Sequence, residues 1–156
     1  MRLRQPFVAL LAALALLLAL AAAPASASDA RIYFLHLTGA KEATATCAPP
    51  TVCGDPDASG VAVLLVIPSR DTVCFATAWR DIDGTVVAAH IHPAPVGVPG
   101  PVAVPLFSGS FAGTGHTAGC VPANGFADDI VANPEGFYMN IHSTVFPPGA
   151  IRDQLR

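Results

Sequence analysis

Three histidines at regular spacing are the residues of this sequence best suited to chemistry. His90 and His92 stand two positions apart in an Ala-His-Ile-His segment, and His142 ends a Tyr-Met-Asn-Ile-His segment. Side chains two apart on a β-strand point to the same side, so His90 and His92 share one face and Ile91 lies on the other. If the two segments form neighbouring strands, the three imidazoles converge. Imidazole nitrogens are good ligands of copper and zinc, so the spacing predicts a site for one such ion.

The same residues also fit a polar network that contains no metal. Tyr138 and Asn140 alternate with apolar residues and would share the polar face with His142. Histidines in such a network bond to backbone carbonyls or carboxylates and need no ion. Arg152 is expected to belong to this network, either as a clamp for an anion or as a structural ion pair with one of three acids: Asp57, Asp128 or Asp129. The sequence leaves the metal site and the metal-free network open.

The elements that must position these side chains are predicted to be β-strands. After Asp29 short runs of Val, Ile, Phe and Thr recur between Gly, Pro and Asp residues, and no long segment keeps a helical period. We expect a single all-β domain, a Greek-key-like β-sandwich or barrel with about eight short strands and little helix. His36 would lie on the first strand and His116 in a Gly-rich loop. The predicted strands are 31–38, 60–67, 72–80, 85–92, 102–107, 110–115, 136–143 and 150–155, with one short helical segment at 126–132.

Four cysteines predict two disulfides in an exported protein. Three pairings are open, and the favoured one joins Cys47 to Cys53 across a short Pro-rich loop. Cys74 would then pair with Cys120 and tie a strand to a distant loop. The alternative, a zinc–thiolate site, fits less well because the gap between Cys47 and Cys53 is wider than the usual spacing of about two to four residues.

The N-terminal segment has the three parts of a secretory signal peptide. Residues 1–4 are basic, residues 7–23 are uninterruptedly apolar, and Ala25-Ser-Ala27 fits the rule for a cleavage site. We therefore expect residues 1–27 to be removed and residues 28–156 to form one secreted domain without stable membrane insertion. An uncleaved anchor is the alternative, because the apolar run reaches the lower limit for a spanning helix.

Composition narrows the classes of partner. The chain has eight basic and 11 acidic residues and a net charge of −3, and it loses Arg2 and Arg4 with the leader. A domain this acidic cannot neutralise phosphates, so we expect no nucleic-acid binding. It has neither a Gly-x-Ser-x-Gly nor a His-Glu-x-x-His motif, so we expect no enzymatic activity. Its partner would be an extracellular protein, a glycan or a small ligand bound through its loops.

Several motifs, in the same order, resemble the CHRD (chordin-type) domain family across nearly all of residues 28–156. The most specific are the His-Ile-His of His90 and His92 and the C-terminal Phe-Pro-Pro-Gly-Ala-Ile-Arg-Asp-Gln-Leu. The family's ending usually reads Gly-Glu-Ile-Arg-Gly-Gln-Leu, so Ala150 and Asp153 depart from it. The other motifs are Leu-Thr-Gly-Ala-Lys-Glu at 37–42, Ala-Ser-Gly at 58–60, Gly97 and Gly100, and Asn133-Pro134 before Tyr138.

The resemblance implies a non-enzymatic exported domain. CHRD domains occur in chordin, an antagonist of bone morphogenetic proteins, and as single-domain exported proteins in microbes. No general enzymatic activity accompanies the family. We therefore expect a secreted binding or structural module without a certain cofactor, and the alternative is a protein that binds one copper or zinc ion through His90, His92 and His142.

Overall fold

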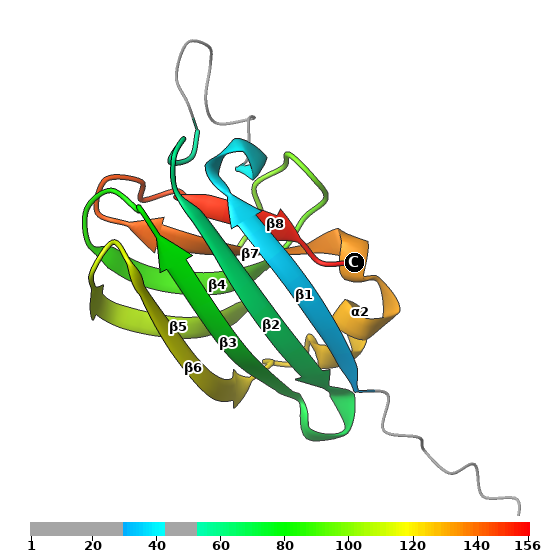
Figure 1. Ribbon diagram of the computed structural model, residues 1–156. Helices are drawn as coiled ribbons and strands as arrows, with labels where there is room; N and C mark the ends of the chain where they lie inside the picture. The colour runs from blue at the N-terminus through cyan, green and yellow to red at the C-terminus, as the bar shows by residue number, and fades with distance from the viewer. Residues whose placement is uncertain (1–29, 43–52) are drawn as a thin grey trace, which may run out of the picture.

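The computed structural model describes residues 30–42 and 53–156, which form a barrel of antiparallel strands (Figure 1). The predicted signal peptide and Cys47, with its predicted disulfide to Cys53, lie outside the described residues. Within the described ranges, no helix is both long enough and apolar enough to cross a bilayer. The elements of these ranges are β1 (Arg31–Thr38), η1 (Gly39–Lys41), β2 (Ser59–Ile67), η3 (Pro68–Arg70), β3 (Thr72–Arg80), β4 (Val86–Pro93), β5 (Val104–Phe111), β6 (Gly115–Pro122), α2 (Ala127–Ala132), η4 (Pro134–Gly136), β7 (Phe137–Ser143) and β8 (Ile151–Gln154).

The eight strands of the described residues belong to one sheet in the order β5-β4-β7-β8-β1-β2-β3-β6, and every neighbouring pair is antiparallel. The sheet curls until β5 and β6, at its two ends, come into contact. Strands β1, β2, β3 and β6 form the front half of this nearly closed barrel, and β4, β5, β7 and β8 form the back half (Figure 1). The predicted all-β, Greek-key-like architecture with about eight strands is confirmed.

Alternation along the strands fills the barrel with apolar side chains. Leu35 and Leu37 of β1 point inward and are buried, as are Ile91 of β4 and Met139 of β7. Their strand neighbours point outward, as the period of two requires. The two halves therefore share one hydrophobic core.

An aromatic cluster fills the place where the sheet ends meet. The Trp79 ring of β3 stacks on Phe107 of β5 at a centroid distance of 5.6 Å and meets Phe111 edge-on at 5.8 Å. Its indole nitrogen donates a hydrogen bond to the Ala112 carbonyl at 3.0 Å. Aromatic contacts of this kind stabilise beyond their buried area, and here they join strands that no backbone ladder joins.

The strand prediction is wrong around β5 and β6. Glycines usually mark turns, but Gly109 lies inside β5 and Gly119 inside β6. A Cβ atom on Gly109 would lie 2.8 Å from the Phe111 ring, and one on Gly119 would lie 3.4 Å from the Phe75 ring. These glycines therefore make room for aromatic rings instead of ending strands. Strand β5 extends past its predicted limits, 102–107, whereas β6 begins at Gly115, the last residue of the strand predicted at 110–115.

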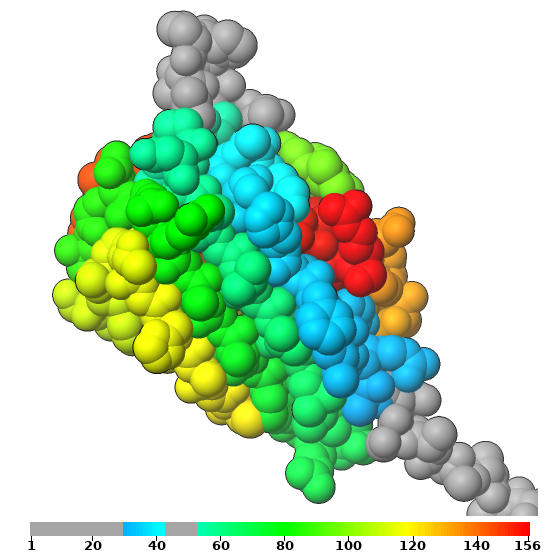
Figure 2. Space-filling model, viewed as in Figure 1, coloured from blue at the N-terminus to red at the C-terminus, as the bar shows by residue number. Residues whose placement is uncertain are grey.

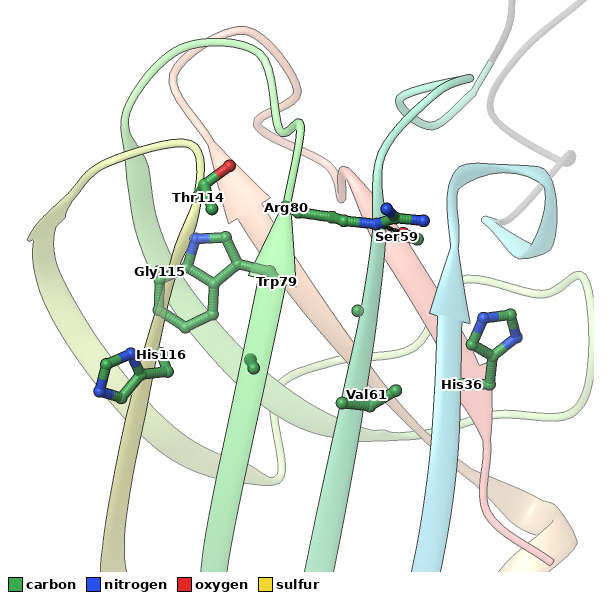
Figure 3. A pocket seen from close by; sticks show the side chains of 10 residues that line it. His36, Ser59, Val61, Trp79, Arg80, Thr114, Gly115 and His116 are labelled. Carbon is green, nitrogen blue, oxygen red and sulfur yellow. Dashed lines mark hydrogen bonds between the residues drawn. The ribbon is translucent and has the colours of Figure 1, made fainter.

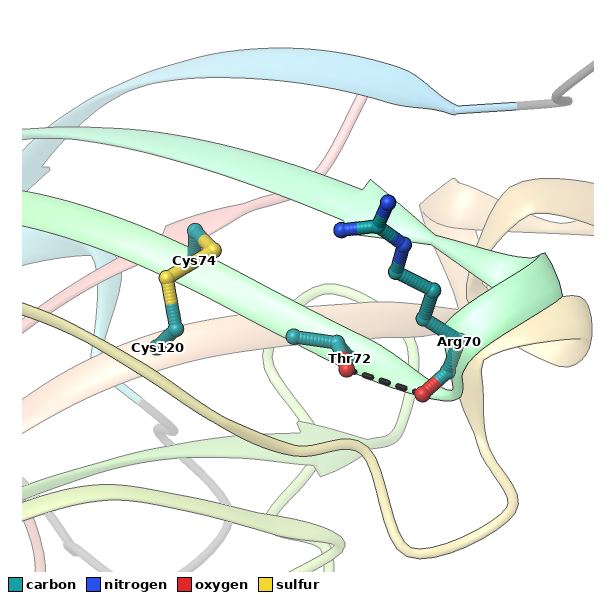
Figure 4. Close-up of a disulfide and its surroundings, with 4 residues drawn as sticks. All are labelled: Arg70, Thr72, Cys74 and Cys120. Atoms are coloured by element: carbon teal, nitrogen blue, oxygen red, sulfur yellow. Dashed lines mark hydrogen bonds between the residues drawn. A yellow bond between two sulfur atoms is a disulfide. The ribbon is translucent and has the colours of Figure 1, made fainter.

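The Cys74–Cys120 disulfide joins the front strands β3 and β6 (Figure 4). The two residues are directly opposite each other in the β3–β6 register. The predicted pairing is confirmed, but Cys120 lies in a strand and not in a loop. The bond consequently fixes the register of β6, the strand at one end of the sheet.

Asp153 attaches β8 to the first strand where few backbone pairs do so. Only Thr38 is paired with β8 in the register of β1. One carboxylate oxygen of Asp153 accepts the backbone N–H of His36 at 2.8 Å, and the other accepts from the Lys41 ammonium at 2.9 Å. The acid that replaces a glycine of the CHRD pattern thus supplies contacts that the short ladder lacks.

Candidate metal centre

The back strands β4 and β7 bring the three histidines together on their outer face. The two strands are antiparallel neighbours, and their register sets His90 opposite Asn140. His92 lies two residues after His90 on β4, and His142 lies two residues after Asn140 on β7. Ile91 points into the core, as expected. The ligand nitrogens offered by the three histidines all lie within 4.8 Å of one another, and the part of the chain that the structure describes contains no other such group.

Two Pro-rich loops supply carbonyl groups to the imidazoles. The loop after β4 places the carbonyls of Gly100 and Pro101 at 3.0 and 2.9 Å from Nδ1 of His92. The loop between β7 and β8 places the Pro147 carbonyl at 2.9 Å from Nδ1 of His142. Proline has no N–H and interrupts ladders, so carbonyls in such loops remain available for side chains.

These contacts define which ring nitrogens carry protons. A carbonyl oxygen can only accept, so Nδ1 of His92 and Nδ1 of His142 are the protonated nitrogens. Nε2 of each neutral ring then holds a bare lone pair. Nδ1 of His90 lies 3.1 Å from Nε2 of His142 and donates to it. Nε2 of His92 and Nε2 of His142 are therefore the nitrogens that an ion would take, and an ion at His142 would replace the proton that His90 Nδ1 now donates there.

Asn140 places a second acceptor in the same space. Its side-chain oxygen lies 3.0 Å from Nε2 of His92, where two lone pairs face each other. A half-turn of the amide would bring its NH₂ group to His92, but it would also turn the oxygen toward the Pro148 carbonyl, now 3.4 Å from the amide nitrogen. A cation held between the Asn140 oxygen and the His92 nitrogen removes this conflict, because the lone pairs of both atoms then point at the cation.

Tyr138 supports the ring of His92. The two rings stack with centroids 4.8 Å apart and an interplanar angle of 7°. The Arg152 guanidinium carbon lies 3.3 Å from the centroid of the Tyr138 ring, on the side of β8, because β7 lies between β4 and β8. The Tyr138 hydroxyl accepts the Gly100 N–H at 3.2 Å. Tyr138 therefore positions both His92 and the loop that hydrogen-bonds to it.

Arg152 does not form the ion pair predicted for it. It is 1% exposed and donates to the Pro95 and Val98 carbonyls at 2.9 and 3.0 Å and to the Gln154 side-chain oxygen at 3.2 Å. The loop after β4 supplies two carbonyl acceptors to the guanidinium, and among the described residues no ion pair joins Arg152 to a predicted acid. Burial lowers the pKa of Arg152. The nearby Tyr138 and Glu42, the residue after η1, oppose this shift by electrostatic attraction. The predicted partners were Asp57, Asp128 and Asp129.

Burial keeps all three histidines neutral around pH 7. Desolvation is the largest cause of the lowered pKa of His90, which falls to about 4, and repulsion from protonated His142 and His92 adds to it. Desolvation also lowers the pKa of His92 and of His142, although hydrogen bonds to carbonyls oppose it. Neutral rings keep the lone pairs that an ion would need.

The lowered pKa values predict a loss of stability in mild acid for the metal-free protein. The unfolded histidines take up protons below their ordinary pKa of about 6.5, whereas the folded His90 does so only near pH 4. The free energy of unfolding should therefore be highest above about pH 6.5 with respect to this group, and it should decrease as the pH falls toward 4.

Urea unfolding at several pH values measures this slope. His90→Gln should flatten it, while His116→Gln, a change to an exposed histidine on another strand, should leave it unchanged. A wild-type slope equal to that of His90→Gln would contradict the prediction.

The remaining two histidines lie on the front half of the barrel. His36 of β1 and His116 of β6 are exposed on its outer face and border a shallow groove there (Figure 3). His116 is in a strand, contrary to the predicted loop. Neither is part of the histidine cluster, because the cluster is on β4 and β7.

Sequence reasoning missed the backbone groups that orient the rings. The carbonyls of Gly100, Pro101 and Pro147 contact the imidazoles, and Gln154 joins the same network by donating to the Ala94 carbonyl at 2.8 Å. The available signal was the density of proline in the two loops, which leaves carbonyls without strand partners. It could not indicate which carbonyl meets which ring.

An all-β barrel with a histidine cluster on one outer face is the class of domain defined by these observations. Comparison with protein-family models matches residues 33–155 to the CHRD domain. Because this match spans most of the sequence, the chain belongs to the CHRD domain family. No curated protein and no solved structure matches the chain. The matched region includes every residue of the histidine cluster.

Proposed function

We propose that this CHRD domain is a secreted, non-enzymatic protein that binds one copper or zinc ion through His90, His92 and His142. The observation that carries the proposal is the separation of their ligand nitrogens, at most 4.8 Å. Zinc binds imidazole at about 2.0–2.1 Å, so neighbouring ligands of a tetrahedral site are about 3.3 Å apart. Small side-chain rotations would bring the three nitrogens to that spacing.

The surroundings of the rings favour a metal ion. Histidine ligands usually donate their other ring N–H to a carbonyl or carboxylate, which fixes the tautomer and the ring orientation. His92 and His142 do so through Nδ1 to carbonyls of the two covering loops. The Asn140 oxygen, 3.0 Å from Nε2 of His92, supplies a possible fourth ligand. His90 and His142 are only partly buried, so an ion would reach the site from solvent.

The donor set suits copper and zinc better than harder ions. Three neutral imidazoles and one amide oxygen provide no carboxylate, which calcium and magnesium prefer. Affinity for divalent ions at nitrogen ligands rises toward Cu²⁺ and falls again at Zn²⁺. We therefore expect the site to bind Cu²⁺ more tightly than Zn²⁺.

Two further parts of the proposal have separate support. Export is supported by the signal-peptide pattern of residues 1–27. Absence of catalysis is supported by the lack of the two hydrolase motifs and by the contacts of the histidines: among the described residues, no serine hydroxyl hydrogen-bonds to a histidine ring. A protein, glycan or small-ligand partner would act in addition to the ion.

Metal titration of the purified, chelator-treated protein tests the proposal. Calorimetry and elemental analysis should give one Cu²⁺ per chain, and bound Cu²⁺ should show nitrogen hyperfine structure in its paramagnetic resonance spectrum. His92→Ala and the less buried His142→Ala should each lose stoichiometric binding. His116→Ala, which changes a histidine on β6, should bind as the wild type does.

Two results would overturn the proposal. One is wild-type protein that takes up no stoichiometric copper or zinc. The other is equal binding by the wild type and a folded His142→Ala variant. Either result would leave the three rings as a metal-free polar network.

A further inference from the structure

The outer face of the front half of the barrel carries large apolar side chains in solvent. Ile32 and Phe34 of β1 are 58% and 76% exposed, and Val61 and Val63 of β2 are 56% and 39% exposed. Figure 2 views this half, with β1, β2, β3 and β6 side by side across the surface. Isolated exposed apolar residues are ordinary, but a contiguous group of them marks an interaction surface.

Strand register makes these residues contiguous. On the central row Phe34 is paired with Val63, Val63 with Ala76, and Ala76 with Ala118. Residue size decreases along this row from β1 to β6. The adjacent row Ile32, Leu65, Cys74, Cys120 repeats the gradient, whereas the row His36, Val61, Ala78, His116 has a histidine at each end.

Charge is confined to one end of this face. Among the described residues on the outward rows there is no carboxylate, and the ionisable side chains are His36, Arg80 and His116. The Asp81 carboxylate, just past the end of β3, lies 3.9 Å from Arg80. The three ionisable side chains of the rows border the groove of Figure 3, where Arg80 also donates to the Ser59 hydroxyl at 3.0 Å. An apolar centre with a polar margin is the usual anatomy of a protein–protein interface.

We propose that a second copy of this chain covers the face, with the two sheets packed front to front about a twofold axis parallel to the strands. Such an axis sets β1 of one copy over β6 of the other and β2 over β3. Phe34 then lies over Ala118 of the second copy, and Val63 lies over Ala76. Large residues meet small ones, which lets the two layers interdigitate.

Electrostatics and size support a second copy. The exported domain lacks Arg2 and Arg4 and has a net charge of 6 − 11 = −5, so two copies repel each other least through a face whose strand rows carry no acid. Four strands of about eight residues span an area of roughly 500 Å² in projection. Side-chain relief raises the accessible area toward the roughly 800 Å² per partner of a standard interface.

The oligomeric state of the full exported domain tests this proposal. Sedimentation equilibrium should give a dimer for the wild type. Val61→Glu would bury a carboxylate in the interface and should raise the dimer dissociation constant at least tenfold. Val145→Glu is the matched control, because Val145 is also 56% exposed but lies in the loop between β7 and β8. It should remain dimeric.

A charge pair tests the orientation. Phe34→Lys should give a monomer, and adding Ala118→Glu should restore dimerisation in a salt-sensitive way, since the two positions meet only across the twofold axis. Circular dichroism would show that each variant is folded. A monomeric wild type would overturn the proposal, as would a wild type that binds lipid vesicles as a monomer through this face. A folded Val61→Glu variant that dimerises as the wild type does would also overturn it.

Discussion

Arg152→Met is expected to lower the free energy of unfolding by about 3 kcal/mol. The change leaves the Pro95 and Val98 carbonyls without their donor, and each hydrogen bond to a charged group contributes about 1.5–3 kcal/mol. It also removes the guanidinium from the Tyr138 ring, a contact of up to about 2 kcal/mol. Release of a buried charge to water offsets part of this loss.

Urea unfolding followed by circular dichroism measures the effect. Arg156→Met is the matched control, because that side chain is 67% exposed and only 3.7 Å from Asp153. Its change should stay within about 0.5 kcal/mol. A loss below about 1 kcal/mol in Arg152→Met would show that the loop after β4 is held by other contacts.

The same variant should weaken copper binding about tenfold if the proposed centre is correct. Arg152 touches no proposed ligand, but it holds the loop whose Gly100 and Pro101 carbonyls orient His92. Loss of groups that orient metal ligands typically costs about 10–100-fold in affinity. Arg152 is therefore a positioning residue. Unchanged affinity in a folded Arg152→Met variant would restrict its role to stability.

Removal of the front disulfide is expected to cost about 4 kcal/mol. Cys74 and Cys120 are 46 positions apart, and closing a loop of that length restricts the unfolded chain by about this amount on the chain-entropy model. The double variant Cys74→Ala with Cys120→Ala leaves no unpaired thiol from this bond. Its β6 strand, at the end of the sheet, should fray first.

Thermal and urea unfolding of the double variant measure the cost, and amide hydrogen exchange shows whether β6 opens before β1 and β2. The metal titration of the double variant serves as an internal control, because the histidines lie on the opposite half of the barrel. Loss of less than about 1 kcal/mol would mean that the aromatic cluster around Trp79 already fixes this edge.

The barrel was predictable where each strand has its own clear pattern. The predicted strands 31–38 and 72–80 have the observed limits of β1 and β3, because each run of apolar and β-branched residues there is bounded by Gly or Asp. The prediction failed at β5 and β6, because Gly109 and Gly119 look like turn residues. These two glycines leave space for the rings of Phe111 and Phe75, and the Phe75 ring belongs to another strand, β3.

In the histidine cluster, too, the local pattern was predictable and the contact between strands was not. The spacing of His90 and His92 is local, and so is the polar alternation of Tyr138, Asn140 and His142, since a strand's period of two is a property of the backbone. Their convergence depended on β4 and β7 being neighbours, which is a property of the folded chain.

The amino-acid sequence by itself determined the all-β class and the alternation that sets His90 with His92 and Asn140 with His142, and it favoured the Cys74–Cys120 pairing among three. Tertiary structure decided which carbonyls orient those rings, that Arg152 binds a loop in place of an acid, and which apolar face remains in solvent. The physical reason is the distance along the chain over which each interaction acts. Strand alternation acts between adjacent residues, whereas loop docking and strand order join groups far apart along the chain.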